Sequence, residues 1–255
     1  VNYDGYIGVR TLTNRVRMAD ARLFAQYSNE AAQYDNQPLP YDLNGLPANN
    51  TDWLSAITGT GFQQNHNVSI TGGTEKTTYL FSAGYMEEEG VLKGSRYDRI
   101  SLRLNNEYTI FKDFKLGHNL SLASEDKDNR PASAFTNAYR QSPLVPVRDV
   151  NSAYGYSTRN NVANPVAQLD YTNDNLRGMR FQGGFYGNLN LFNHLSLYSN
   201  FGIETGQNRG TIYNPVYEVS SNQRNPTRAK TAGRKAVAKV PTEALRLTPA
   251  AATRI

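Results

Sequence analysis

The sequence predicts an all-β fold, an antiparallel up-and-down segment of a transmembrane β-barrel with about seven strands. Apolar and polar residues alternate with period two, which is the pattern of a strand with two different faces. The alternation recurs in consecutive segments between Gly61 and Glu125. The connections between segments are either very short or long, as in a transmembrane barrel with tight turns at one end and long loops at the other.

The clearest strand pattern lies in the third of these segments. Ile100, Leu102 and Leu104 fall on one face, whereas Ser101 and Arg103 fall on the other. A helix would scatter both sets around its circumference, so a strand is predicted here. The same reasoning predicts the other strands within Val1 to Arg10, Phe62 to Ile70, Thr78 to Tyr85, Lys115 to Leu122, Phe181 to Leu191 and Leu195 to Glu204.

Three connections read as tight hairpin turns, at Gly72–Glu75, Lys112–Asp113 and Asn193–His194. Glycine, asparagine and aspartate suit the backbone conformations that such turns need. If the first strand rises from the periplasm, all three turns lie on the periplasmic side. The long connections and the segment from Glu87 to Ser95 then all lie outside.

Two connections are much longer than the loops of ordinary compact domains, 11–60 and 126–177. In the first, Met18 to Ala32 has helical periodicity, and Thr51 or Asp52 is expected to cap a short second helix. The second is rich in proline, tyrosine and asparagine. A further loop is predicted over 206–228.

The net charge of +5 does not indicate a nucleic-acid-binding face. Residues 229–255 carry six basic residues and one acidic residue, so residues 1–228 are neutral overall. This tail contains no aromatic residue and does not alternate. It is expected to be either a disordered basic tail or, as the preferred hypothesis, an out-of-frame end, because its composition changes where another strand is due.

No pattern in the chain indicates an enzyme, a cofactor or a metal site. The chain has no cysteine, and its three histidines, His66, His118 and His194, lack metal-ligand spacing. They are expected to be structural or to face the lumen. The acidic segments Glu87–Glu89 and Glu125–Asp128 are expected to be solvated loop tips, the second because it lacks the pattern of a calcium loop.

The tyrosines divide into two groups. Strand tyrosines are expected to form aromatic girdles at the membrane interfaces, namely Tyr6, Tyr79, Tyr85, Tyr108 and Tyr198. Loop tyrosines could contact a substrate or simply pack within the loops, two alternatives that the sequence leaves open. The candidates for substrate contact are Tyr139, Tyr154, Tyr156 and Tyr171.

Several motifs, in collinear order, resemble the SusC/RagA family, the TonB-linked outer-membrane transporters of Bacteroidota. They cover roughly residues 1–220, and we regard them together as specific. The motifs are Tyr3–Asp4–Gly5–Tyr6, Thr51–Asp52–Trp53, Gln64 to Gly73, Thr78–Tyr79 through Gly84–Tyr85, Glu89–Gly90–Val91, Arg99 to Asn105, Ser142–Pro143–Leu144 and Asn164–Pro165.

The resemblance implies a 22-stranded barrel with an N-terminal plug, of which residues 1–228 would be the N-terminal part of the barrel. It also implies outer-membrane lipids as surroundings, a SusD-like surface lipoprotein as partner, and TonB-powered import of glycans or peptides. The plug that would contact the TonB complex is not among these residues. We therefore expect a fragment of a longer protein, which in isolation would aggregate or need detergent.

Alternation alone also permits a soluble β-sandwich that serves as a binding or adhesion module. In a sandwich the polar faces would meet solvent and the apolar faces would meet each other. The sorted loop lengths and the family resemblance favour the barrel segment.

Overall fold

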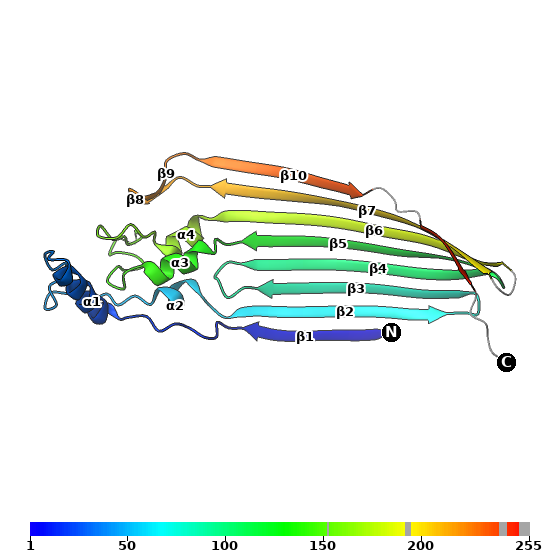
Figure 1. The fold of residues 1–255 in the computed structure, drawn as a ribbon, viewed down its shortest axis with the longest axis horizontal. Helices are drawn as coiled ribbons and strands as arrows, with labels where there is room; N and C mark the ends of the chain where they lie inside the picture. Colours follow the sequence, from blue (N-terminus) through cyan, green and yellow to red (C-terminus); the bar gives the residue numbers. More distant parts are fainter. Residues whose placement is uncertain (152, 192–194, 240–243, 250–255) are drawn as a thin grey trace.

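The computed structural model describes residues 1–151, 153–191, 195–239 and 244–249. One long antiparallel sheet dominates the chain, and helices and loops gather at one end of it (Figure 1). The first seven strands lie side by side in chain order, which confirms the predicted fold class. They are β1 (Asn2–Arg10), β2 (Gly61–Gly73), β3 (Thr77–Glu89), β4 (Arg96–Phe111), β5 (Phe114–Asn129), β6 (Asn173–Leu191) and β7 (Leu195–Asn214).

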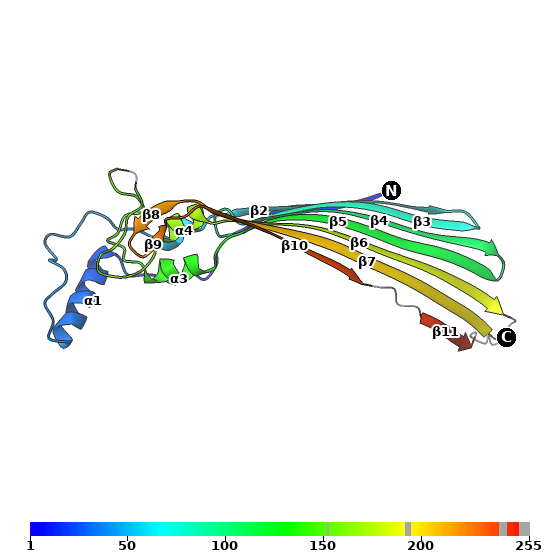
Figure 2. The same cartoon turned by 90° about the horizontal axis from the view of Figure 1, so that it is seen from above.

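The sheet is curved and open rather than closed on itself over the part of the chain that the structure describes (Figure 2). Its tight turns lie at the end away from the helices. Lys112–Asp113 connects β4 to β5 as predicted, and residues 74–76 connect β2 to β3, slightly later than the predicted turn because Gly72 and Gly73 still belong to β2. The predicted turn at Asn193–His194 lies outside the described residues.

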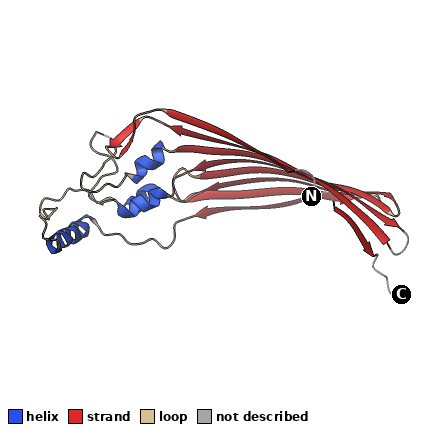
Figure 3. Ribbon diagram, turned by 45° about the horizontal axis from the view of Figure 1, so that its top comes forward, coloured by secondary structure: helices blue, strands red, loops and turns tan. Residues whose placement is uncertain are grey.

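Four helices occupy the two long connections at the opposite end of the sheet (Figure 3). The first connection contains α1 (Ala21–Tyr34) and α2 (Trp53–Ile57), and the second contains α3 (Ser133–Arg140) and α4 (Pro165–Tyr171). The predicted helix and the predicted cap of its shorter neighbour are both confirmed. No helix in the described ranges has the length and apolarity needed to cross a membrane.

Side-chain caps start the two helices of the first connection. The Asp20 carboxylate accepts a hydrogen bond from the Leu23 backbone N–H at 2.8 Å, and the Asp52 carboxylate accepts one from the Ser55 N–H at 3.0 Å. Each cap satisfies a backbone donor that the first turn of a helix leaves unpaired.

The strands extend further toward the loops than the sequence predicted. The second long connection spans 130–172 rather than 126–177, and β7 continues to Asn214 where a loop was expected. The acidic segments 87–89 and 125–128 accordingly lie in β3 and β5 rather than at loop tips. Near the loops both faces of these strands become polar, so alternation disappears although the backbone pairing continues.

In the described part of the chain, four more strands follow β7. The hairpin of β8 (Tyr217–Ser220) and β9 (Gln223–Asn225) lies in the predicted loop 206–228, and β10 (Ala229–Lys239) and β11 (Ala244–Pro249) both pair with β7. These two strands thus lie in the stretch that was expected to be either a disordered tail or an out-of-frame end. The out-of-frame hypothesis rests on the missing alternation of side chains. Because any sequence can form backbone hydrogen bonds, the pairing of this stretch with β7 does not test that hypothesis.

The register of the strands aligns their apolar side chains on one face of the sheet. Phe81 pairs with Ile70 on β2 and with Leu104 on β4, and Leu104 pairs in turn with Leu120 on β5. This face is uncovered, since Phe81 is 43% exposed and Leu102 is 41% exposed. A soluble sandwich would cover it with a second sheet, whereas the other sheet among the described residues is the β8–β9 hairpin near the helices.

The best-buried apolar cluster lies among the helices and loops rather than under the sheet. Trp53, Leu54 and Ile57 of α2 form its centre, and each is at most 3% exposed. Ala134 and Ala138 of α3 pack against them. The loops beyond the sheet thus form a compact unit with its own small core.

Candidate functional site

The face opposite the apolar one carries a polar network near the tight turns. Lys115 on β5 forms an ion pair with Glu107 on β4 at 2.9 Å, and the Tyr186 hydroxyl donates a hydrogen bond to the other Glu107 oxygen at 2.9 Å. The ring of Tyr186 stacks on that of Tyr198 with centroids 5.9 Å apart. These contacts join β4 to β7 across the wall that would face the lumen of a barrel.

Similar contacts continue toward the loops on the same face. Arg10 on β1 forms an ion pair with Glu88 on β3, and the Tyr97 hydroxyl donates to Glu125 at 2.9 Å. Hydroxyl, amide and charged groups therefore line this face along much of its length, as expected for a surface in contact with water.

The predicted aromatic girdle divides between the two faces. Tyr79 and Tyr108 lie on the apolar face near the tight turns, and Tyr85 lies on that face near the loops. Tyr6 and Tyr198 are instead on the polar face, where they pair with Asn65 and Asn188. On each strand they lie next to residues of the apolar face, and neighbouring residues of a strand point to opposite faces.

The two described histidines lie on the apolar face, where both ring nitrogens of His66 and one of His118 have hydrogen-bond partners. His66 contacts the Tyr3 hydroxyl at 2.7 Å and the Gln64 side chain at 3.0 Å. His118 contacts the Asn106 amide at 3.3 Å. These contacts give both rings a structural role. In the described ranges, no group of histidine, cysteine or acidic side chains is arranged to hold a metal ion.

A hollow of about 440 Å³ opens between the start of α1, the start of α2 and the end of α3. Buried Trp53 forms part of its lining, and Tyr139 is the one predicted substrate-contact residue there. Three arginines contribute to the lining, namely Arg15, Arg17 and Arg140. Neither Arg17 nor Arg140 forms an ion pair with another described residue. The hollow thus combines aromatic groups with unpaired positive charge.

Arg15 is held at the edge of this hollow by the cap of α2. Its guanidinium donates to the Asp52 carboxylate at 2.9 Å and to the Ser55 hydroxyl at 2.8 Å. Partial burial acts to raise the pKa of Asp52, but the hydrogen bonds from Ser55 and the charge of Arg15 outweigh it, and the pKa is lowered overall.

The other three tyrosine candidates lie elsewhere in the loops. Tyr154 is 9% exposed, and its hydroxyl donates to Asp170 while accepting from Arg148 at 2.5 Å. Burial and this contact with Asp170 raise the pKa of Tyr154 to about 12. Tyr171 stacks on Tyr217 with ring centroids 4.1 Å apart, and Tyr156 is 54% exposed. Tyr154 and Tyr171 therefore take part in loop packing.

Asn164 joins three segments of the loop region from a fully buried position. Its side-chain oxygen accepts from Val166 and Ala167 at the start of α4, and its amide donates to the backbone oxygens of Val147 and Gly155. Its backbone exchanges two hydrogen bonds with the Gln223 side chain, at 2.7 and 3.0 Å.

The sequence indicated only part of this region. The helix cap at Asp52 and the candidate contact residue Tyr139 were both predicted from the local sequence. Arg15, Arg17 and Arg140 were not singled out, because they are far apart in the sequence and only the packing of α1, α2 and α3 brings them together.

Comparisons with known proteins agree with this architecture. The chain is 25% identical over 205 residues to TonB-dependent receptor P3 of Formosa agariphila, which covers 76% of this chain and 20% of that protein. It is 26% identical over 212 residues to TonB-dependent receptor SusC of Bacteroides thetaiotaomicron, covering 72% of this chain and 20% of that protein. No family model matches the chain.

Solved structures show the same fold. A structure of the RagAB peptide transporter matches with a TM-score of 0.69 and 18% identity, covering 92% of this chain and 31% of the other. The chain thus spans only a fifth to a third of the length of these three proteins. TonB-dependent receptors reside in the outer membrane and are transporters, not enzymes. The open sheet described above matches part of an outer-membrane barrel, and the chain is similar over this partial length to TonB-dependent receptors of the SusC/RagA type.

Proposed function

We propose that this chain forms part of the wall and outer mouth of an importer for oligosaccharides or peptides. The observation that carries the proposal is the two-faced sheet, with exposed apolar side chains on one face and a connected polar network on the other. In a closed barrel the first face would meet lipid and the second would line a wet passage. The structural match to the RagAB peptide transporter favours peptides over oligosaccharides.

The hollow near Trp53 and Tyr139 would contact substrate before it enters the passage. Tyrosine and arginine suit both substrate classes, since an aromatic ring stacks on a sugar face or packs against an apolar side chain. Tyr156, which is exposed, would be a second contact. Tyr154 and Tyr171 would support the loops.

A SusD-like surface lipoprotein is proposed to work with this importer at the side where the helices and loops gather. The RagAB complexes support this partnership, because they pair a similar barrel with a second protein. Energy would come from the TonB complex through a plug domain. No residue of this chain is proposed to carry that coupling.

The test compares uptake by cells that carry the intact gene, a deletion, and the deletion with the gene restored. Fluorescent oligosaccharides and peptides are offered, with and without a protonophore. Energy-dependent uptake of one class, lost on deletion and restored with the gene, would support the proposal. Unchanged uptake of every class after deletion would contradict it.

Two further measurements separate the parts of the proposal. This chain has no cysteine, so Gly184→Cys on the polar face and Phe185→Cys on the apolar face offer a matched pair for a water-soluble maleimide. Only Gly184→Cys should react if the polar face lines a wet passage. Affinity purification of the full-length transporter should recover a SusD-like lipoprotein in an amount equal to the transporter. If no such lipoprotein is recovered, the proposed partner is wrong, but the proposed transport function is unaffected.

A further inference from the structure

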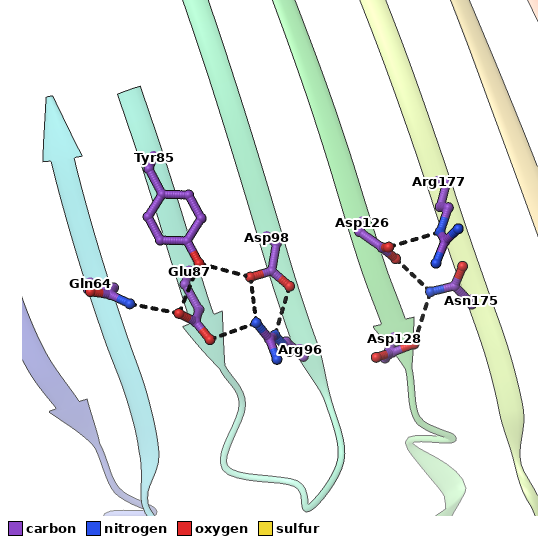
Figure 4. Close-up of polar contacts among 9 residues, drawn as sticks. All are labelled: Gln64, Tyr85, Glu87, Arg96, Asp98, Asp126, Asp128, Asn175 and Arg177. Atoms are coloured by element: carbon purple, nitrogen blue, oxygen red, sulfur yellow. Dashed lines mark hydrogen bonds and ion pairs between the residues drawn. The ribbon is translucent and has the colours of Figure 1, made fainter. Parts of the chain in front are cut away.

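On the apolar face, one row of directly paired residues marks the end of the apolar zone toward the loops. Each member of the row is the register partner of the next, from β2 to β7. The row consists of Gln64, Glu87, Asp98, Asp126, Arg177 and Arg209, of which Figure 4 shows the first five. On the side of the tight turns, the next rows contain Ile100, Met179, Leu102 and Phe181.

The acidic side chains Glu87 and Asp98 of this row share one arginine, Arg96, and accept hydrogen bonds within the protein. Glu87 accepts from the Gln64 amide at 2.7 Å and the Tyr85 hydroxyl at 3.0 Å, and it pairs with Arg96 at 2.9 Å. The same Arg96 pairs with Asp98 at 2.7 Å. Figure 4 shows these groups lying side by side over β2, β3 and β4.

The two arginines of the row, Arg177 and Arg209, have one carboxylate partner between them in the described ranges, Asp126. Arg177 donates its Nε to Asp126 at 2.9 Å, and that carboxylate also accepts from the Asn175 amide at 2.6 Å. The terminal nitrogens of Arg177 make no contact with another described residue, and its side chain is 70% exposed. Asp126 therefore orients the guanidinium from one side and leaves its outer edge open.

Arg209 lies directly opposite Arg177, on the same face of the neighbouring strand. It is exposed, and over the described ranges it has no carboxylate partner. Like charges placed directly opposite on paired strands destabilise a sheet. Such an arrangement is most readily explained by an anion that binds between the two guanidinium groups.

We propose that Arg177 and Arg209 together bind a phosphate group of a lipid in the outer leaflet of the outer membrane. Their position fits this ligand, because they stand where the lipid-facing apolar zone ends on the side of the outer loops. A guanidinium donates paired hydrogen bonds that match the geometry of phosphate oxygens. The acyl chains of the same lipid would lie along Met179, Phe181 and Ile203 below. The proposal depends on residence in the outer membrane and not on which substrate is imported.

The experiment measures lipid retention by the full-length purified transporter with native mass spectrometry. The probes are bisphosphorylated lipid A and the same lipid with its phosphates removed. The variant is Arg177→Gln/Arg209→Gln. Arg103→Gln is the matched control, because Arg103 is also an exposed arginine without a described partner but lies on the polar face of β4.

We expect the double variant to retain about tenfold less bisphosphorylated lipid A, and Arg103→Gln to retain the wild-type amount. The dephosphorylated lipid should bind the wild type as weakly as the phosphorylated lipid binds the double variant. Excess inorganic phosphate should compete only weakly, because it lacks the acyl chains. Equal retention by the wild type and the double variant, or equal binding of the two lipids, would overturn the proposal.

Loss of folding would also reduce lipid retention, so two readouts guard against it. Single variants Arg177→Gln and Arg209→Gln should each show an intermediate loss. Substrate uptake in cells should stay at the wild-type level in the Arg177 and Arg209 variants. Uptake that persists while lipid retention falls would separate this site from the transport function proposed above.

Discussion

The indole nitrogen of Trp53 donates a hydrogen bond to the backbone carbonyl oxygen of Ser142 at 2.9 Å. The two residues belong to different long connections, and both are buried, at 3% and 1% exposure. This contact helps to tie the loop after β1 to the loop after β5, together with hydrogen bonds from Thr51 to the backbone oxygens of Pro143 and Val145. It lies beside the hollow that contains Tyr139, so it also fixes one wall of the candidate substrate site.

Replacing Trp53 by phenylalanine should loosen this junction without unfolding the sheet. The substitution leaves the Ser142 carbonyl buried without its donor and opens space in the core, which should cost about 2 to 4 kcal/mol locally. Hydrogen exchange of the full-length protein should show faster exchange in α2 and α3 with unchanged exchange in β3 to β6. Tyr34→Phe, at an 89% exposed site in the same connection, is the control and should change nothing.

The assignment of the two faces can be tested with one pair of neighbouring residues. Leu102→Arg would place a charge on the lipid-facing surface, at a cost of about 2 to 4 kcal/mol near the middle of the bilayer. Ser101→Arg would place the same charge on the wet face and should be tolerated. The readout is the fraction of full-length protein that runs as a folded band on an unheated gel. Equal folded fractions for the two variants would contradict the assignment.

The cap at Asp52 should make the start of α2 sensitive to acid. Because the folded state lowers the pKa of this carboxyl, its contribution to stability is present above the usual aspartate pKa of about 3.9 and is lost as the pH falls through the lower folded value. Pepsin cleavage near Trp53–Leu54 should therefore increase over this range. Asp52→Asn keeps a capping oxygen but cannot titrate, so its cleavage should lack this step. A step of the same size in both proteins would exclude Asp52 as its cause.

The stretch from residue 229 onward carries a separate prediction. Its backbone pairs with β7, yet it has no aromatic residue and no alternation. We expect one of the other two reading frames of the coding DNA to continue the alternating pattern after Arg228. If neither frame does so, the hypothesis of an out-of-frame end should be dropped.

The two-faced sheet and the helix caps were accessible to sequence reasoning because each rests on a local rule. Alternation at Ile100, Leu102 and Leu104 assigns a face directly, and an aspartate before Trp53 is a standard helix start. The strand ends at Asp126 and Arg177 were missed, since polar residues on both faces give no periodic signal. The opposition of Arg177 and Arg209 was also inaccessible, because it depends on the register between β6 and β7.

The two hydrogen bonds between Asn164 and Gln223 have a consequence for the order of assembly. Each of the first seven strands pairs with the strand that precedes it in the chain, so the wall can grow strand by strand as the chain is delivered. The bond partner of Asn164 arrives only after β7 is complete. The buried anchor of α4 is therefore incomplete until then, and the outer mouth becomes rigid only after the first seven strands have been delivered.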